Sequence, residues 1–264
     1  MSPAYRNSLN LVRIRTVLLA VLACAPASSA ASAAACSFEA QGEGRVAAVI
    51  DARSFRLADG REVRLAGIEP ASPEAARRTA ALSAIVAGRD VTLRAEDDAP
   101  DRYGRQTAFV FVAGEPKSVQ ASLLAQGEAF AAADIADKDC SAALLAAESA
   151  GRAAKMGIWA SATATKNAES TGDILAGNGR FMLVEGRVLS VRQSGATTYL
   201  NFGRNWTRDF AVTISRRMLP SLEAIGMAPK SLENRRIRVR GFIETRTGPR
   251  IELLRAGQLE LLVD

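Results

Sequence analysis

The sequence predicts a mainly β protein with helices, of the α+β class, folded as two domains. The stretch 49–74 alternates apolar and polar residues on both sides of Asp59-Gly60, which is the pattern of a β-hairpin. The stretch 180–264 contains five strand-like segments and one helical segment. A length of 264 residues is sufficient for two domains that each bury a core.

The residue composition limits the kinds of catalysis and metal binding that the chain can perform. Apolar residues make up 48% of it, and the formal net charge of +6 favours polyanionic partners. The sequence contains no histidine, which excludes Ser-His and Cys-His catalysis and imidazole metal sites. Any catalysis must therefore use carboxylates, arginines and an activated or metal-bound water.

The N-terminal residues 1–35 resemble a bacterial-type signal peptide. Arg6, Arg13 and Arg15 precede an apolar run, 17–25, that is too short to span a bilayer, and small residues follow. We therefore expect an exported protein, periplasmic or secreted, with no stable membrane span once the signal is removed. An N-terminal membrane anchor and a lipoprotein are the alternatives.

The cysteines fit export. Cys24 would leave with the signal, so that Cys36 and Cys140 remain as a pair in an oxidising compartment. This predicts a Cys36–Cys140 disulfide. The alternatives are two free thiols, or a lipidated Cys36 with Cys140 alone.

The first domain is expected over 36–159. Ser72, Pro73 and Glu74 have the residue types of a helix N-terminus, and Gly127 is a helix stop. The predicted strands are 44–57, 62–68, 89–95 and 107–112, and the predicted helices are 72–86, 118–126 and 141–155.

A polar stretch without apolar periodicity, 160–179, is predicted to be a linker. The second domain, 180–264, carries fourteen arginines and one lysine against eight acids. Its predicted strands are 181–191, 197–202, 209–214, 235–244 and 250–254, and its predicted helix is 215–226. One helix between the third and fourth of five strands is an OB-like pattern.

Charged residues gather near the predicted hairpin of the first domain. Asp51, Arg64 and Glu69 are expected near its end, and Arg105 follows a loop and precedes a strand. Two guanidinium groups at one site suit a phosphodiester, because they bind phosphate in bidentate fashion.

At these positions the chain resembles the thermonuclease (staphylococcal nuclease-like) family. The resemblance covers 44–159 and includes V-I-D, V-R-L-A-G-I-E, D-R-Y-G-R, L-L-A-Q-G-E-A and G-I-W, in that order. It implies an OB-type β-barrel with helices, and active members cut DNA or RNA with calcium. The segments GRVLSV, TYLNFG and RVRGFIETRTGPRIEL are similar to an OB-like domain that follows the nuclease-like domain in some exported bacterial proteins.

The resemblance implies roles for individual residues. Arg64 and Arg105 match the two phosphate-holding arginines, and Asp51 and Glu69 match acids that hold calcium. Arg102 and Tyr103 match a lysine and a tyrosine beside the bound nucleotide. The water-activating glutamate falls on Ser72 without gaps, and on Glu74 if two residues are inserted.

One position departs from the family pattern. The second acid of the calcium site falls on Arg53. A guanidinium about 5 Å from a divalent ion, at an effective dielectric constant of about 20, opposes its binding by roughly 6 kcal/mol. Calcium also prefers several oxygen ligands. This predicts weakened calcium binding.

In the second domain, Arg236, Arg238 and Arg240 alternate with Ile237 and Val239 along one predicted strand. Residues of one parity share a face of a strand, so the arginines are predicted to form an exposed face that binds phosphates. An ordinary charged surface is the alternative.

The sequence therefore predicts a monomeric exported protein that binds nucleic acid or another phosphate-rich ligand, with calcium-dependent hydrolysis weakened or lost. The first alternative is an active secreted calcium-dependent nuclease. The second is a cell-envelope module that binds a protein or polysaccharide.

Overall fold

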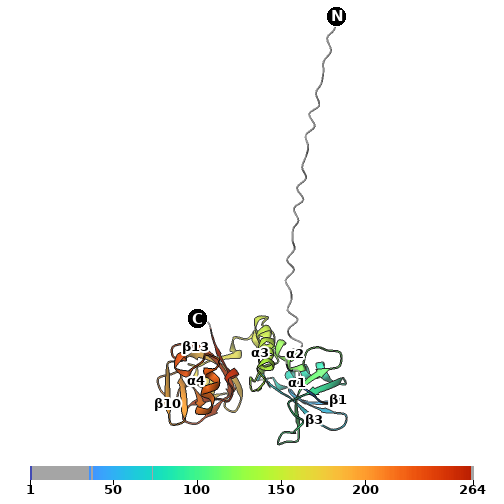
Figure 1. Cartoon of the computed structure of the whole chain (residues 1–264), viewed down its shortest axis with the longest axis horizontal. Coiled ribbons are helices and arrows are strands. Elements are labelled where there is room, and N and C mark those ends of the chain that lie inside the picture. The colour runs from blue at the N-terminus through green and yellow to red at the C-terminus, as the bar shows by residue number, and fades with distance from the viewer. Residues whose placement is uncertain (2–35, 37, 73, 263–264) are drawn as a thin grey trace. The chain divides into compact units, whose positions relative to one another are not determined.

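The computed structural model describes Met1, Cys36 and residues 38–72 and 74–262 (Figure 1). The predicted signal peptide, apart from Met1, lies outside the described residues, as does Pro73. The described residues from Cys36 onward belong to one compact unit. In this part of the chain, no helix has both the length and the apolar character needed to cross a membrane.

A closed barrel forms the core of the first domain, with strand order β1-β2-β3-β6-β5. Its strands are β1 (Ala40–Asp51), β2 (Ser54–Leu57), β3 (Glu62–Leu65), β5 (Asp90–Arg94) and β6 (Gln106–Val112). Strands β3 and β6 run parallel, whereas the other neighbours are antiparallel. The apolar positions of the alternating pattern point into the barrel, where Phe55, Val63 and Leu93 are fully buried. The prediction of a mainly β fold with a five-stranded barrel is confirmed.

Three helices and a short strand pair complete this domain: α1 (Ala75–Val86), α2 (Val119–Ala125), α3 (Lys138–Ala153), β4 (Ile68–Pro70) and β7 (Ala129–Ala131). Ser118 begins α2 by accepting a hydrogen bond from the Ala121 amide, at 3.1 Å. Helix α1 begins three residues later than predicted. Glu74 adopts a left-handed backbone conformation there, with φ 78°, and Ser72 does not cap the helix.

The Cys36–Cys140 disulfide is present, as the sequence predicts. Cys140 lies in the first turn of α3, and Asp137 begins this helix by accepting a hydrogen bond from the Cys140 amide at 2.7 Å. The bond therefore joins the start of the described region to α3, across 104 residues of chain.

The second domain consists of two sheets, which Figure 1 colours yellow to red. The five-stranded sheet has the order β10-β11-β12-β15-β14, with β10 (Ser190–Ser194), β11 (Thr197–Asn201), β12 (Ala211–Ser215), β15 (Pro249–Leu253) and β14 (Glu244–Thr245). The four-stranded sheet has the order β16-β13-β9-β8, with β16 (Leu259–Leu261), β13 (Arg236–Phe242), β9 (Phe181–Arg187) and β8 (Thr165–Asn167). The OB-like assignment of this domain stays a prediction.

Short helical segments connect these strands: η1 (Gly157–Ala160), η2 (Ala162–Ala164), α4 (Thr171–Leu175), η3 (Arg216–Met218), α5 (Leu219–Glu223), η4 (Pro229–Leu232) and η5 (Ala256–Gln258). The predicted linker 160–179 is not an unstructured connection. Strand β8 pairs in parallel with β9, and Ile174 of α4 is buried in the core of the second domain. Because β8 joins the sheet through its backbone, this secondary structure leaves no apolar pattern in the sequence, and the domain boundaries stay a prediction.

The two domains share a buried interface. Phe130 of β7 lies 5.5 Å from Trp159 and 6.4 Å from Phe181 of β9, measured between ring centroids. Arg240 of β13 donates to the Ala131 carbonyl at 2.8 Å and forms an ion pair with Glu148 of α3 at 2.5 Å. Both side chains of this ion pair are 0% exposed. The second domain is therefore packed onto the first.

Candidate functional site

The turn between β1 and β2 lies at one end of the barrel and holds Asp51 and Arg53. The Arg53 amide donates to Oδ1 of Asp51 at 2.8 Å, and the Leu65 amide donates to the Arg53 carbonyl at 2.8 Å. The first bond closes the turn, and the second fixes it against β3. The backbone of Arg53 is thus held at this end, which we call the barrel mouth.

The guanidinium of Arg53 forms an ion pair with Glu69 of β4 and donates to the Ile68 carbonyl at 3.3 Å. Only 16% of the Arg53 side chain and 14% of the Glu69 side chain are exposed. The arginine is therefore turned into the barrel mouth, toward the acid, and away from solvent.

Burial affects two acids at the barrel mouth. It raises the pKa of Glu69, an effect that the charge of Arg53 opposes and the charges of Asp134 and Asp51 reinforce. Burial also raises the pKa of Asp134, and its own backbone, Arg53 and Arg255 oppose this shift. Arg53 is thus one of the cations that oppose these shifts, together with Arg255 at Asp134, which is more accessible to solvent than Glu69. The sequence analysis did not identify Asp134 or Arg255, which carry no motif of their own.

The loop before β6 holds the second predicted phosphate ligand, Arg105. Its Nε and Nη2 donate to Oδ2 of Asp101 at 2.9 and 2.7 Å. The amides of Tyr103 and Arg105 donate to Oδ1 of the same carboxylate at 2.9 and 3.0 Å. The side-chain hydrogen bond from Arg105 is the largest of the effects that lower the pKa of Asp101 to about 2. The carboxylate thus fixes both the loop and the Arg105 side chain.

Tyr103 projects from this loop with 65% of its surface exposed. The guanidinium carbon of Arg102 lies 4.8 Å from the centre of its ring, and that of Arg105 lies 4.9 Å away. Such cation–π contacts hold an aromatic ring beside two positive charges. The group can offer a stacking surface and cations to the same ligand.

Arg64 lies half-buried on β3, opposite Ser54 of β2 and Thr107 of β6. Its side chain makes no hydrogen bond or ion pair with another described residue. The hydrogen bond that Arg105 donates to Asp101 is the largest effect that raises the pKa of Arg105, and the charge of Asp51 adds to it. The structure therefore places Arg105, Asp51, Arg53 and Glu69 around one mouth, with Arg64 on a strand that forms it.

Residues 62–161 match the family model described as staphylococcal nuclease homologue. The chain carries a staphylococcal nuclease-like domain. Its closed five-stranded barrel agrees with the OB-type fold of that family. A comparison with curated proteins found no match. The matched family suggests a nuclease-like or nucleic-acid-binding function, and its members generally depend on calcium.

The nuclease-like domain of this chain does not fit a calcium ion at the expected place. Arg53 lies outside the matched residues, at the position where the resemblance predicts an acid, and its guanidinium binds Glu69, one of the two predicted calcium ligands. Within the described ranges, no group of three or more acidic or cysteine side chains is arranged to hold a metal. A cation at the centre of the site repels a divalent ion and uses the oxygens that would bind it.

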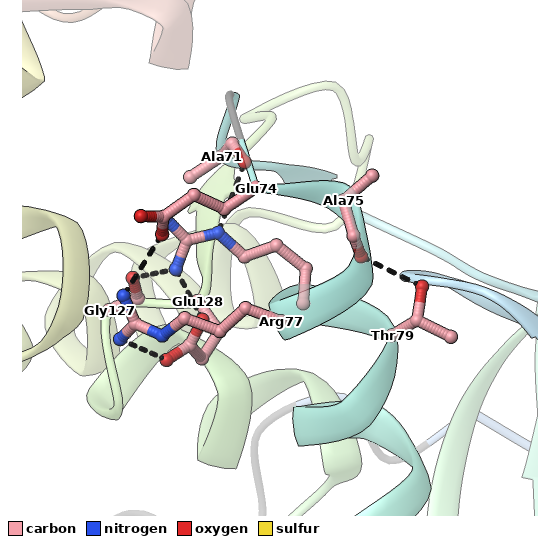
Figure 2. A network of polar contacts seen from close by, with 8 residues as sticks. Ala71, Glu74, Ala75, Arg77, Thr79, Gly127 and Glu128 are labelled. Atoms are coloured by element: carbon pink, nitrogen blue, oxygen red, sulfur yellow. Dashed lines mark hydrogen bonds and ion pairs between the residues drawn. The ribbon is translucent and has the colours of Figure 1, made fainter.

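Glu74, the predicted water-activating residue, belongs to another cluster. Its carboxylate lies 3.1 Å from Arg77 and 3.6 Å from Arg78, at the N-terminus of α1 (Figure 2). Arg78 is buried, forms an ion pair with Glu128 and donates to the Ala71 carbonyl at 3.1 Å. These ion pairs fix the Glu74 side chain against the first turns of α1.

Ser72, the other position considered for this role, lies beside the second domain. Its hydroxyl accepts a hydrogen bond of 3.5 Å from Nη1 of Arg180. The charges that shift the pKa of Glu69 come from Arg53, Asp134 and Asp51. Neither Ser72 nor Glu74 thus contributes to the charged group around Glu69.

The predicted exposed face of Arg236, Arg238 and Arg240 is wrong for two of its members. Arg240 is fully buried and binds Glu148 and Glu260. Arg238 binds Glu185 at 2.6 Å and Glu260 at 2.9 Å, with 12% of its side chain exposed. Of the three arginines, only Arg236 is exposed. The alternation correctly grouped the three arginines, but α3 and β7 cover the end of the strand where Arg240 lies.

Proposed function

We propose that this is an exported protein whose nuclease-like domain binds the phosphate backbone of nucleic acid at the barrel mouth, without calcium-dependent hydrolysis. The family match supports the class of ligand. The contact between Arg53 and Glu69 is the observation that carries the loss of hydrolysis.

The pairing of Arg53 with Glu69 has two consequences for catalysis. A calcium ion would have to displace a partly buried guanidinium from both Glu69 and the Ile68 carbonyl. Without the ion, the site lacks a Lewis acid to stabilise the charge that develops on the phosphate during attack. The Glu74 carboxylate is also bound by Arg77 and Arg78.

The side chains that we expect to bind phosphate are present and accessible at the barrel mouth. Arg64 has no partner among the described residues, and a half-buried guanidinium is a strong ligand for a phosphate oxygen. Arg105 uses Nε and Nη2 on Asp101, which leaves Nη1 without a bond to that acid. The exposed Tyr103 ring, between Arg102 and Arg105, supplies a surface for a base or sugar.

Two features support export to the periplasm or the medium. The N-terminal sequence has the basic, apolar and small-residue segments of a signal peptide. The Cys36–Cys140 disulfide is the kind of bond that persists in oxidising compartments.

Binding is tested with the purified mature chain and a fluorescently labelled oligonucleotide, measured by anisotropy in EDTA. We expect binding that weakens steeply with salt, since binding of phosphates releases counterions. Arg64→Ala should weaken it, whereas Arg56→Ala, which removes an exposed β2 arginine paired with Glu62, should not. Binding that persists at high salt would instead favour a module for protein or polysaccharide. Calcium-dependent degradation of the oligonucleotide, abolished by Arg105→Ala, would show an active nuclease and refute the proposal.

A further inference from the structure

The second domain has a groove of about 1070 Å³ that lies apart from the barrel mouth. Its floor is the outer face of the sheet formed by β10, β11, β12, β15 and β14. Arg192, Tyr199 and Thr213 lie side by side across this sheet, whereas the next residues along the strands, such as Val191 and Leu200, are buried in the core. Because strand side chains alternate between faces, the polar row points into the groove.

Four arginines line this groove, which we call the arginine groove: Arg192, Arg204, Arg246 and Arg250. Arg250 forms an ion pair with Glu244 at 3.1 Å. The side chains of the other three make no hydrogen bond or ion pair with any described residue.

Acidic groups near the arginine groove are fewer than its arginines. Asp209 lines it, and its Oδ2 accepts a hydrogen bond of 2.9 Å from the Asn205 amide. Glu244 is paired with Arg250, and Glu252 is exposed opposite Thr213 on the same sheet. Arg238, on the other sheet of this domain, is by contrast bound to two carboxylates. The arginine groove thus has positive charge that no ion pair with a described residue neutralises.

Aromatic rings accompany these charges. Trp206, in the loop after β11, is 69% exposed and lines the groove, and Tyr199 is half-buried in its floor. The other tryptophan, Trp159, is only 8% exposed. An exposed indole beside guanidinium groups provides a stacking surface next to anion ligands.

We propose that the arginine groove binds single-stranded nucleic acid. Guanidinium groups bind backbone phosphates, and the rings of Trp206 and Tyr199 stack on bases. A single strand exposes the faces of its bases, whereas a duplex hides them, so the aromatic groups favour the single strand. The site lies on a different domain from the barrel mouth, and its existence does not depend on the function proposed there.

The test uses the full mature chain carrying Arg64→Ala and Arg105→Ala, so that the barrel mouth contributes little, and a labelled oligothymidylate of about 15 nucleotides. The same groove substitutions are also measured in the unmodified chain. Trp206→Ala should weaken binding about tenfold, in keeping with the loss of one stacked base, whereas Trp206→Phe should retain most of it. Arg204→Ala with Arg246→Ala should flatten the dependence of log K on log salt by about 0.7 for each phosphate that the variant no longer neutralises.

Arg216→Ala with Arg217→Ala is the matched control, because it removes the same charge from exposed arginines that do not line the groove. This control variant should keep an affinity within about twofold of that of the parent, because it reduces only the general attraction between positive charge and a polyanion. Tryptophan fluorescence gives an independent signal, since Trp206 is the exposed one of the two tryptophans. Binding should change this signal in the parent and not in Trp206→Ala.

Any of three results would overturn the proposal. The first is that the groove variants bind like the control double variant, and the second is that a duplex of matched length binds as tightly as the single strand. The third is full competition by a sulfated polysaccharide, with binding that is insensitive to Trp206→Ala. Circular dichroism verifies that each variant is folded, which we expect for the groove substitutions because Trp206, Arg204 and Arg246 are exposed.

Discussion

Replacing Arg240 with methionine tests how the second domain is held to the first. The Arg240 side chain is fully buried and contacts Glu148, the Ala131 carbonyl and Glu260. Methionine approximates the length of the arginine but supplies no charge. Glu148, also fully buried, would then lose the guanidinium with which it forms its ion pair.

The cost follows from this burial. Removing one member of a buried ion pair typically costs about 3–5 kcal/mol, because the other charge stays buried without compensation. Burial already raises the pKa of Glu148, so this carboxylate can take up a proton in the variant. We therefore expect Arg240→Met to lower the free energy of unfolding by about 3 kcal/mol at neutral pH, which is the lower end of this range.

The pH dependence has a defined sign. Loss of the Arg240 charge should raise the pKa of Glu148 further in the folded state. An acid whose pKa is raised on folding stabilises the protein most at low pH, and this contribution is lost as the pH rises through the folded pKa. The destabilisation by Arg240→Met should therefore be smaller at pH 5 than at pH 8.

Urea unfolding followed by fluorescence measures these effects, since Trp159 lies at the interface and Trp206 in the second domain. Arg240→Met with Glu148→Leu should recover most of the loss, because an apolar pair leaves no buried charge. Arg45→Met, which removes an exposed pair with Asp90, should cost less than about 1 kcal/mol. A loss of under about 1 kcal/mol for Arg240→Met at every pH would refute the reasoning, because it would place the pair among weak surface interactions.

Three further predictions concern the first domain. The Asp101 carboxyl should titrate by NMR near a pKa of about 2, and Arg105→Ala should return it toward 3.8; an unchanged value would show that Arg105 does not hold this acid. Arg53→Ala should raise the pKa of Glu69 further, because it removes the charge that opposes the effect of burial. The melting temperature of the variant should therefore fall more between pH 5 and pH 8 than that of the parent chain. An equal decrease in melting temperature for both proteins would contradict the pairing of Arg53 with Glu69. Cys140→Ser should lower the unfolding free energy by about 2–5 kcal/mol in urea titrations, and an unchanged midpoint would show that the disulfide does not stabilise the fold.

Much of the fold could be predicted because local pattern and final burial agree. The alternation around Phe55 and Val63 places these residues inside the barrel, as expected. The start of α1 could not be predicted, because Glu74 takes a left-handed backbone conformation instead of the Ser72 cap.

The environment of the arginines was harder to predict than their positions. Strand parity groups Arg238 with Arg240, but it does not reveal that α3 places Glu148 against Arg240. At the barrel mouth, the family resemblance predicted that Arg53 takes the place of an acid. The structure adds that its side chain binds Glu69, because both lie in a partly buried mouth where each charge needs a partner.

Calcium binding to the parent chain and to Arg53→Asp tests the central claim most directly. Thermal unfolding is measured with calcium and with EDTA, beside an assay of DNA and RNA degradation. We expect the parent to show no calcium-dependent shift and no degradation, while Arg53→Asp, which restores a carboxylate next to Asp51 and Glu69, gains stability in calcium. Stabilisation of the parent by calcium, with degradation of nucleic acid that Arg105→Ala removes, would contradict the account.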